Sequence, residues 1–162
     1  MIDQYFDDNT TGTPNGHGFG KAPDDPLHPE SRAAGYYSFK IAKNVQGIVM
    51  DTVALQLGSN GQIPDPQFRW IEKQLKKNSR VYYNEAGERK RNREAKNKMF
   101  VFFSHHHSQS MSNTYVDEDT PPEALPLHCF DSDASESCSA GEGLHSLLNR
   151  FPNVIGWVNG HS

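Results

Sequence analysis

The chain has 162 residues, of which 35% are hydrophobic and 22% are charged, and its formal net charge is −4. This length is enough for one domain with a hydrophobic core, while the low hydrophobic content indicates that loops and solvated surface form much of the chain. The weak negative charge gives no reason to expect a nucleic-acid partner, and no apolar stretch approaches the roughly 20 residues that a membrane-spanning helix needs.

The first segment, residues 1–35, is rich in glycine, proline, aspartate and asparagine. These residues favour turns, and a long irregular stretch is unusual at the start of a compact domain. We therefore interpret residues 1–35 as an irregular connecting segment that follows something upstream. No apolar signal-peptide core follows Met1, so the compartment stays open at this point.

Two strands are predicted next, at 36–41 and 48–53, because both runs are rich in aromatic or β-branched residues. The segment 44–47 between them contains asparagine and glycine, and we expect it to form a turn. The two strands together are predicted to form a hairpin.

A helix is predicted to begin at Asp65, with Asp65 as its N-cap and Pro66 at its first position. Phe68, Ile71 and Leu75 then fall on one face of this helix, which we expect to be buried. The pattern therefore predicts an amphipathic helix that covers a sheet.

The segment 80–98 is polar and highly charged, and we interpret it either as an insertion or as a frayed helix. Its basic run at 89–93 lies among Glu85, Glu88 and Glu94. We interpret this run as a solvated connector, with contact to nucleic acid as a minor alternative.

The C-terminal part combines apolar runs with one short helix. Met99–Ser104 lacks polar alternation and is predicted to be a fully buried strand. A long acidic loop at 108–143, a short helix at 144–150 and a last strand at 154–158 follow. This order of strands and helices predicts an α/β fold with functional sites at the strand ends.

Cys129 and Cys138 lie nine positions apart in the acidic loop. This spacing allows a disulfide, which would indicate an oxidising compartment. Two reduced thiols are an equal alternative.

Both of the last two predicted strands lead into histidine. The first is followed by His105, His106 and His107, and the second by Gly160-His161. If the two strands are neighbours in one sheet, His105 and His161 emerge at the same edge. Neutral imidazole is a good ligand for zinc, manganese and iron, so this edge is a candidate metal site.

These polar residues also have simpler structural interpretations. A single histidine at a strand end is usually a hydrogen-bonded surface residue, and His107 is expected to be structural. Asp51, at the end of the second strand, is interpreted as a turn residue or as an acceptor that orients a ligating histidine, rather than as a ligand. Asn113 and Asn159 lie near the proposed edge and are weaker candidates.

Several motifs in this order resemble the C-terminal half of calcineurin-like metallophosphoesterases, in particular the branch with cyclic-nucleotide phosphodiesterases and secreted bacterial phosphoesterases. The resemblance covers about residues 36–162, with gaps in the two insertions. The motifs are Asp51-Thr52, Gly61-Gln62-Ile63, Gln67-x-x-Trp70-Ile71-Glu72-x-x-Leu75, Ser104-His105-His106, Leu147-Leu148-x-x-Phe151-Pro152-x-Val154 and Gly160-His161.

The resemblance implies half of a two-sheet αββα sandwich, with residues 36–162 as the C-terminal half of the domain and 108–143 as a loop insertion. It also implies hydrolysis of a phosphomonoester or phosphodiester by a hydroxide that two divalent metal ions (manganese, iron or zinc) activate. By resemblance, His105 and His161 are ligands of the same metal ion, and His106 lines the pocket and orients the substrate. The implied partner is a small phosphate ester.

The family's Asp-x-His, Gly-Asp-x-x-Asp and Gly-Asn-His-Asp/Glu motifs do not occur in this sequence. We therefore expect that the chain is a fragment of a longer domain and that it holds at most one partial metal site. Two alternatives follow, a truncated non-catalytic fragment and a histidine module that binds a single metal ion.

Overall fold

The computed structural model describes residues 23–24, 26–27, 34–53, 59–113, 115–116, 118, 120, 122–131 and 142–160. The remaining residues, including most of segment 1–35 and His161, lie outside the described part. The strands are β1 (Tyr37–Ala42), β2 (Val45–Val49), β3 (Ile63–Pro64), β4 (Val81–Tyr83), β5 (Arg89–Arg91), β6 (Met99–Ser104), β7 (Leu127–His128) and β8 (Val154–Asn159). The helices are α2 (Asp65–Asn78) and α3 (Leu144–Asn149), with short 3-10 turns at Ser108–Ser110 and Pro122–Ala124.

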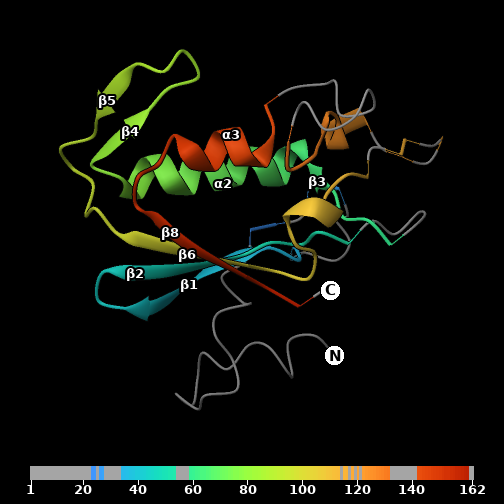
Figure 1. Ribbon diagram of the computed structural model, residues 1–162, viewed down its shortest axis with the longest axis horizontal. Helices are drawn as coiled ribbons and strands as arrows, with labels where there is room; N and C mark the ends of the chain where they lie inside the picture. The colour runs from blue at the N-terminus through green and yellow to red at the C-terminus, as the bar shows by residue number, and fades with distance from the viewer. Residues whose placement is uncertain are drawn as a thin grey trace.

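Four strands form the main sheet, in the order β1-β2-β6-β8. β1 pairs with β2 antiparallel, whereas β2 and β8 both run parallel to β6. Figure 1 shows α2 and α3 on the same side of this sheet. β3 with β7 and β4 with β5 form two small antiparallel sheets. The fold is therefore mixed α/β, as predicted, and neither helix among the described residues is long and apolar enough to cross a membrane.

The hydrophobic core lies between the two helices and the facing side of β2 and β6. Phe100 and Phe102 of β6 are fully buried, whereas Met99 is 41% exposed and Val101 and Phe103 are half-buried. The prediction of a fully buried strand was therefore wrong, because only one face of β6 packs under the helices. Phe68, Ile71 and Leu75 of α2 are also buried, which confirms the predicted face of this helix. The cluster is completed by Ile48, Met50, Ile63, Met111, Leu144, Leu147 and Phe151.

The start of α2 differs from the prediction by one position. Pro64 occupies the N-cap position, and no side chain caps the helix there. Asp65 is the first helical residue, and its carboxylate contacts His128 Nε2 at 2.9 Å and Arg69 Nε at 3.3 Å. The prediction of Asp65 as N-cap was wrong because a partner from β7, distant in the sequence, holds its side chain.

The hairpin of β1 and β2 is confirmed, but its turn is shorter and earlier than predicted. The turn is at 43–44, and Gly47 lies inside β2 opposite Phe39. A Cβ at Gly47 would lie 2.4 Å from Cε1 of Phe39. The glycine therefore marks a close approach of a ring to the strand instead of a turn.

The segment 80–98 contains an ordered β-hairpin, so the prediction of a frayed helix was wrong. β4 and β5 pair antiparallel, and the turn between them is closed by the Gly87 N–H, which donates to Asn84 O at 2.9 Å. Gly87 has a φ of 74°, which glycine adopts most readily. Figure 1 shows this hairpin projecting beyond one end of the helices.

The described part of the acidic loop carries structure of its own. Both 3-10 turns and β7 fall within 108–143, and β7 pairs with β3 ahead of α2. Cys129 is disulfide-bonded, and the other cysteine of the sequence, Cys138, lies outside the described residues. The strand β8 and helix α3 agree with their predictions to within one residue.

We expect Phe102→Ala to destabilise the chain by about 3 to 5 kcal/mol, because it removes a fully buried ring from the contact of sheet and helices. Met99→Ala on the same strand is the matched control, since Met99 is 41% exposed, and its effect should stay below about 1 kcal/mol. Urea unfolding monitored by circular dichroism measures both. Equal effects of the two variants would contradict this assignment of the core.

Candidate metal centre

Three parallel strands end at the same edge of the main sheet. Ser104 of β6 pairs with Asn159 of β8, and the Gly160 N–H donates to His105 O at 3.2 Å. On the other side of β6, the Met50 N–H donates to Phe103 O at 2.8 Å. The two strands that lead into histidine are therefore neighbours in one sheet, which was the condition for a shared edge. Asp51, His105 and Gly160 all leave the sheet at this carboxyl edge.

His105 is an exposed residue at this edge. Its ring meets the ring of His106 edge-on, with the centroids 4.8 Å apart. His161, the other predicted ligand, follows Gly160 directly in the sequence but lies outside the described residues.

His106, predicted to line the pocket, is 5% exposed and hydrogen-bonded at both ring nitrogens. Nε2 lies 3.1 Å from Ser59 O, and Nδ1 lies 2.8 Å from Thr52 Oγ1. Because a carbonyl oxygen only accepts, Nε2 carries the proton and Nδ1 accepts from the Thr52 hydroxyl. The arrangement fits a neutral imidazole that joins the end of β6 to the segments around Thr52 and Ser59.

Gly61 makes room for this imidazole. A Cβ at Gly61 would lie 2.7 Å from the ring of His106 and 2.9 Å from Thr52 O. The backbone beside it is also fixed, because the Gly61 N–H donates to Ser110 O at 2.7 Å and the Gln62 N–H donates to Thr52 O at 3.2 Å. The loop 59–62 is thus held against the end of β6.

Asp51 is positioned by helix α2. The Asp51 N–H donates to Gln67 Oε1 at 2.8 Å, and Gln67 Nε2 donates to Asp51 O at 2.5 Å. Gln67 is 2% exposed, so both contacts are shielded from water. The carboxylate itself is exposed, and its Oδ1 accepts from the Val53 N–H at 3.2 Å. This is the turn arrangement that the sequence favoured for Asp51.

The remaining polar candidates make local contacts. His107 Nδ1 accepts from the Gln109 N–H at 3.1 Å and so caps a 3-10 turn, which agrees with its structural interpretation. Asn113 Nδ2 donates to Asn60 O at 3.3 Å, close to the loop that holds His106. Asn159 is exposed on β8.

Sequence reasoning missed the residues that hold this edge in place, namely Thr52, Gln67 and Trp157. Trp157 Nε1 donates to Ser104 Oγ at 2.7 Å, and Ser104 Oγ donates to His106 O at 2.6 Å. A sequence signal existed only for Gln67, a polar residue beside the apolar face of a helix. Thr52 and Trp157 have no local signal because their partners are distant in the sequence.

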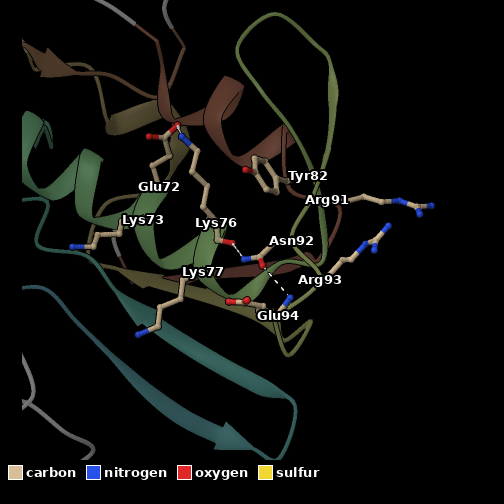
Figure 2. Close-up of a pocket in the computed structure, with 9 residues that line it drawn as sticks. All are labelled: Glu72, Lys73, Lys76, Lys77, Tyr82, Arg91, Asn92, Arg93 and Glu94. Carbon is tan, nitrogen blue, oxygen red and sulfur yellow. Dashed lines mark hydrogen bonds and ion pairs between the residues drawn. The ribbon is translucent and has the colours of Figure 1, made fainter.

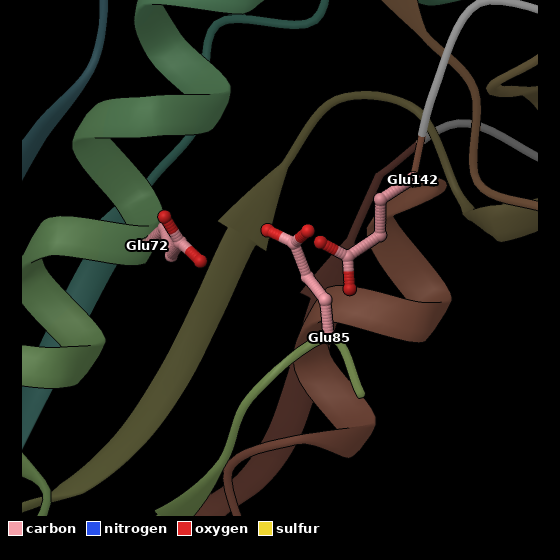
Figure 3. A group of neighbouring side chains, drawn as sticks. All are labelled: Glu72, Glu85 and Glu142. Atoms are coloured by element: carbon pink, nitrogen blue, oxygen red, sulfur yellow. The ribbon is translucent and has the colours of Figure 1, made fainter. Parts of the chain in front are cut away.

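A second group of possible metal ligands lies on the helix side. Glu72, Glu85 and Glu142 bring carboxylate oxygens within 4.8 Å of one another. Figure 3 shows the three carboxyl groups turned toward each other from α2, from the turn after β4 and from the segment before α3. Oxygen ligands at such separations can hold a divalent cation.

Two cations already occupy positions beside this group. Arg150 Nη2 lies 2.6 Å from Glu72 Oε1 and 3.0 Å from Glu142 Oε2. Its Nε forms an ion pair with Glu142 Oε1 at 2.9 Å, although without hydrogen-bond geometry. Lys76 Nζ lies 2.8 Å from Glu72 Oε1. The group is therefore best described as an ion-pair cluster that joins α2 to the end of α3.

The pKa values of Glu72, which is buried, and Glu142, which is partly buried, shift in opposite directions in this cluster. Burial raises the pKa of Glu72, but hydrogen bonds and charge from Lys76 and Arg150 outweigh it, so the pKa is lowered overall. Burial raises the pKa of Glu142, and Glu85 and Glu72 raise it further against the opposing charge of Arg150.

We expect Thr52→Val to destabilise the chain by about 1 to 3 kcal/mol, because it leaves Nδ1 of His106 buried without its hydroxyl partner. Val53→Ala is the control, since Val53 is 54% exposed. Urea unfolding measures the free energies, and proton NMR of the His106 ring reports the lost hydrogen bond. A change for Thr52→Val no larger than that of the control would contradict the structural role of His106.

We expect the free energy of unfolding to fall as the pH drops below about 4.5, the ordinary pKa of glutamate. The contribution of Glu72 is present above its unfolded-state pKa and is lost as the pH falls through its lower folded-state value. Glu142, with a raised pKa, acts in the opposite sense, since its protonation favours the folded state.

Glu72→Gln should flatten this loss at acid pH and cost about 1 to 3 kcal/mol at neutral pH, because Arg150 then keeps only Glu142. Urea unfolding over a series of pH values measures the effect, with the exposed Glu123→Gln as control. An unchanged slope at acid pH in Glu72→Gln would show that other groups cause the loss.

No protein-family model, no curated protein and no solved structure matches the chain. Similarity therefore assigns no family to it.

Proposed function

We propose that the chain is the C-terminal half of a metal-dependent phosphoesterase domain, with His105 and His161 as ligands of one metal ion. The single observation that carries the proposal is the parallel pairing of β6 and β8 up to their ends. There the Gly160 N–H donates to His105 O at 3.2 Å. Two segments that lead into histidine, far apart in the sequence, thereby leave the sheet side by side.

The exposed face of the sheet supports the finer assignment to half of an αββα sandwich. Both helices cover one face, while Val158 of β8, which lies opposite Phe103, is 54% exposed. In a two-sheet sandwich a second sheet would cover the face away from the helices. An exposed apolar side chain on β8 is what half of such a domain would present.

The donor set fits a divalent metal ion. The exposed imidazole of His105, at the end of β6, is a ligand type that manganese, iron and zinc accept, while Asp51 at the end of the neighbouring β2 remains a turn residue. When bound, a pair of such ions supplies a hydroxide nucleophile and positive charge for a phosphate ester. The described residues account for part of one ion's ligand set.

The chain's own residues contribute position and rigidity. His105 offers its imidazole from the end of β6, and Gln67 holds the backbone of Asp51 in place. In this proposal His106 acts as a positioning residue, because both its ring nitrogens are engaged with Thr52 and Ser59. The substrate class is a phosphomonoester or phosphodiester.

The test compares His105→Ala with His145→Ala in the native protein. His145 is the control because its exposed ring pairs with Asp131 and stacks on Phe130, and it has no part in the proposed ligand set. We expect His105→Ala to lower Mn²⁺ affinity, measured by electron paramagnetic resonance, by roughly tenfold to a hundredfold. Hydrolysis of bis(p-nitrophenyl) phosphate and p-nitrophenyl phosphate should fall by at least as much, and His145→Ala should change neither.

Unchanged metal affinity and hydrolysis in His105→Ala would overturn the proposal. Binding of one ion without hydrolysis under any metal would instead favour the histidine module that binds a single metal ion. If the native protein bound none of Mn²⁺, Zn²⁺ and Fe²⁺, the remaining alternative would be a truncated non-catalytic fragment.

A further inference from the structure

The positive charge of the chain is concentrated in one segment. Residues 73–98 hold ten of the sixteen lysines and arginines but only three of the twenty aspartates and glutamates. This segment therefore carries a formal charge of +7 within a chain of net charge −4. A single net charge for the chain conceals this separation.

The fold turns this segment into a groove of about 720 Å³ between the C-terminal half of α2 and the β4–β5 hairpin. Its cationic lining residues are Lys73, Lys76, Lys77, Arg91 and Arg93, and its acidic ones are Glu72 and Glu94. Figure 2 shows Arg91 and Arg93 extending outward from the hairpin on one side, and Lys73 and Lys77 extending from α2 on the other side. We call this the basic groove.

Most of these cations lack a compensating acid. Among the described residues, Lys76 pairs with Glu72, whereas Lys73, Lys77, Arg91 and Arg93 form no ion pair. Uncompensated cations gathered along a groove attract a polyanion and raise its rate of encounter.

The positive field extends to the start of β6. A neighbouring hollow of about 560 Å³ is lined by Lys77, Lys96 and Lys98. Burial lowers the pKa of Lys98, and repulsion from Lys96, Lys77 and Lys40 lowers it further. The lysines around this hollow are thus close enough to repel one another, and an anion between them would relieve that repulsion.

This surface lies at the opposite end of the sheet from the candidate metal centre. The Lys98 N–H donates to Asn78 O at the end of α2, and β6 begins at the next residue. His105 follows the other end of β6. A ligand of the basic groove would therefore bind away from the proposed metal centre.

Two tyrosines accompany the cations. Tyr82 lines the groove and is held by stacking on Phe151, with ring centroids 5.4 Å apart and planes 15° from parallel. Its neighbour Tyr83 points to the other face of the hairpin, where it is 37% exposed and lies opposite Arg89 at the border of the groove. Cations that follow a backbone together with aromatic rings that contact bases are typical of surfaces that bind single strands.

We propose that the basic groove binds single-stranded nucleic acid through its phosphates, largely independently of base sequence. A strand brings regularly spaced phosphates, which arginine contacts through two parallel hydrogen bonds, and planar bases for the tyrosines. An acidic polypeptide brings charge without a partner for the rings. An anionic membrane likewise brings charge without planar bases for the tyrosines.

The test measures fluorescence anisotropy of a labelled oligothymidylate of about 20 nucleotides, titrated with the full chain at about 50 and about 200 mM salt. Wild type should bind more weakly at the higher salt concentration. Arg91→Gln combined with Arg93→Gln should weaken binding roughly tenfold and reduce the salt slope by about 1.4, because each of the two lost phosphate contacts contributes about 0.7 on a single strand.

Arg69→Gln is the control variant, since Arg69 pairs with Asp65 outside the groove. It should change the affinity by less than about twofold. Tyr83→Ala should weaken binding with an unchanged salt slope, because it removes a ring and no charge. His105→Ala should bind as wild type does, and unfolding midpoints confirm that each variant is folded.

The proposal is overturned if oligothymidylate does not bind at about 50 mM salt, or if the arginine pair behaves as Arg69→Gln does. Polyglutamate and phosphatidylserine vesicles are the competing probes. Tighter binding of polyglutamate would assign the groove to an acidic protein, and tighter binding of vesicles would assign it to a membrane surface. Either result would overturn the assignment to nucleic acid.

Discussion

The parallel pairing of β6 with both β2 and β8 is the constraint on which the rest of the structure depends. β6 is apolar along its whole length, so one face supplies Phe100 and Phe102 to the core under the helices. Because its neighbours run in the same direction, everything that follows these strands emerges at one edge and everything that precedes them emerges at the other. The two edges of the sheet therefore carry different side chains. Imidazole and carboxylate groups lie at the carboxyl edge, and lysine and arginine lie at the amino edge.

Buried polar contacts hold the chain in place at the carboxyl edge of the sheet and on its helix side. At the carboxyl edge, His106 joins β6 to Thr52 and Ser59, so that a histidine in a row of three acts as a structural link. On the helix side, Arg150 joins Glu72 of α2 to Glu142 before α3. Such groups are costly to leave unpaired when buried. The contacts of His106 therefore hold the neighbouring surface residue His105 in position. The contacts of Arg150 hold the β4–β5 hairpin, which carries Glu85, in position.

The two proposed activities use different physics. A metal centre needs few ligands held at defined positions on rigid elements, which the ends of parallel strands provide. Binding of a polyanion needs many cations with little geometric precision, which α2 and a projecting hairpin provide. Since residues 73–98 carry a formal charge of +7 within a net charge of −4, the rest of the chain carries a formal charge of −11. An anionic strand would therefore be steered toward the basic groove.

The sequence by itself determined the elements whose pattern is local. The unbroken apolar run of β6, the buried face of α2 and the hairpin of β1 and β2 follow from periods and turn residues within a few positions. The tertiary structure alone decided which residues meet. Thr52 and His106 are 54 positions apart, and Glu72 and Arg150 are 78 apart. The order of strands, the ordered hairpin in a charged segment and the gathering of cations into a groove likewise depend on contacts between distant segments. The local period of a sequence predicts which face of a helix or strand is apolar. Which other element packs against that face is decided only by the three-dimensional fold.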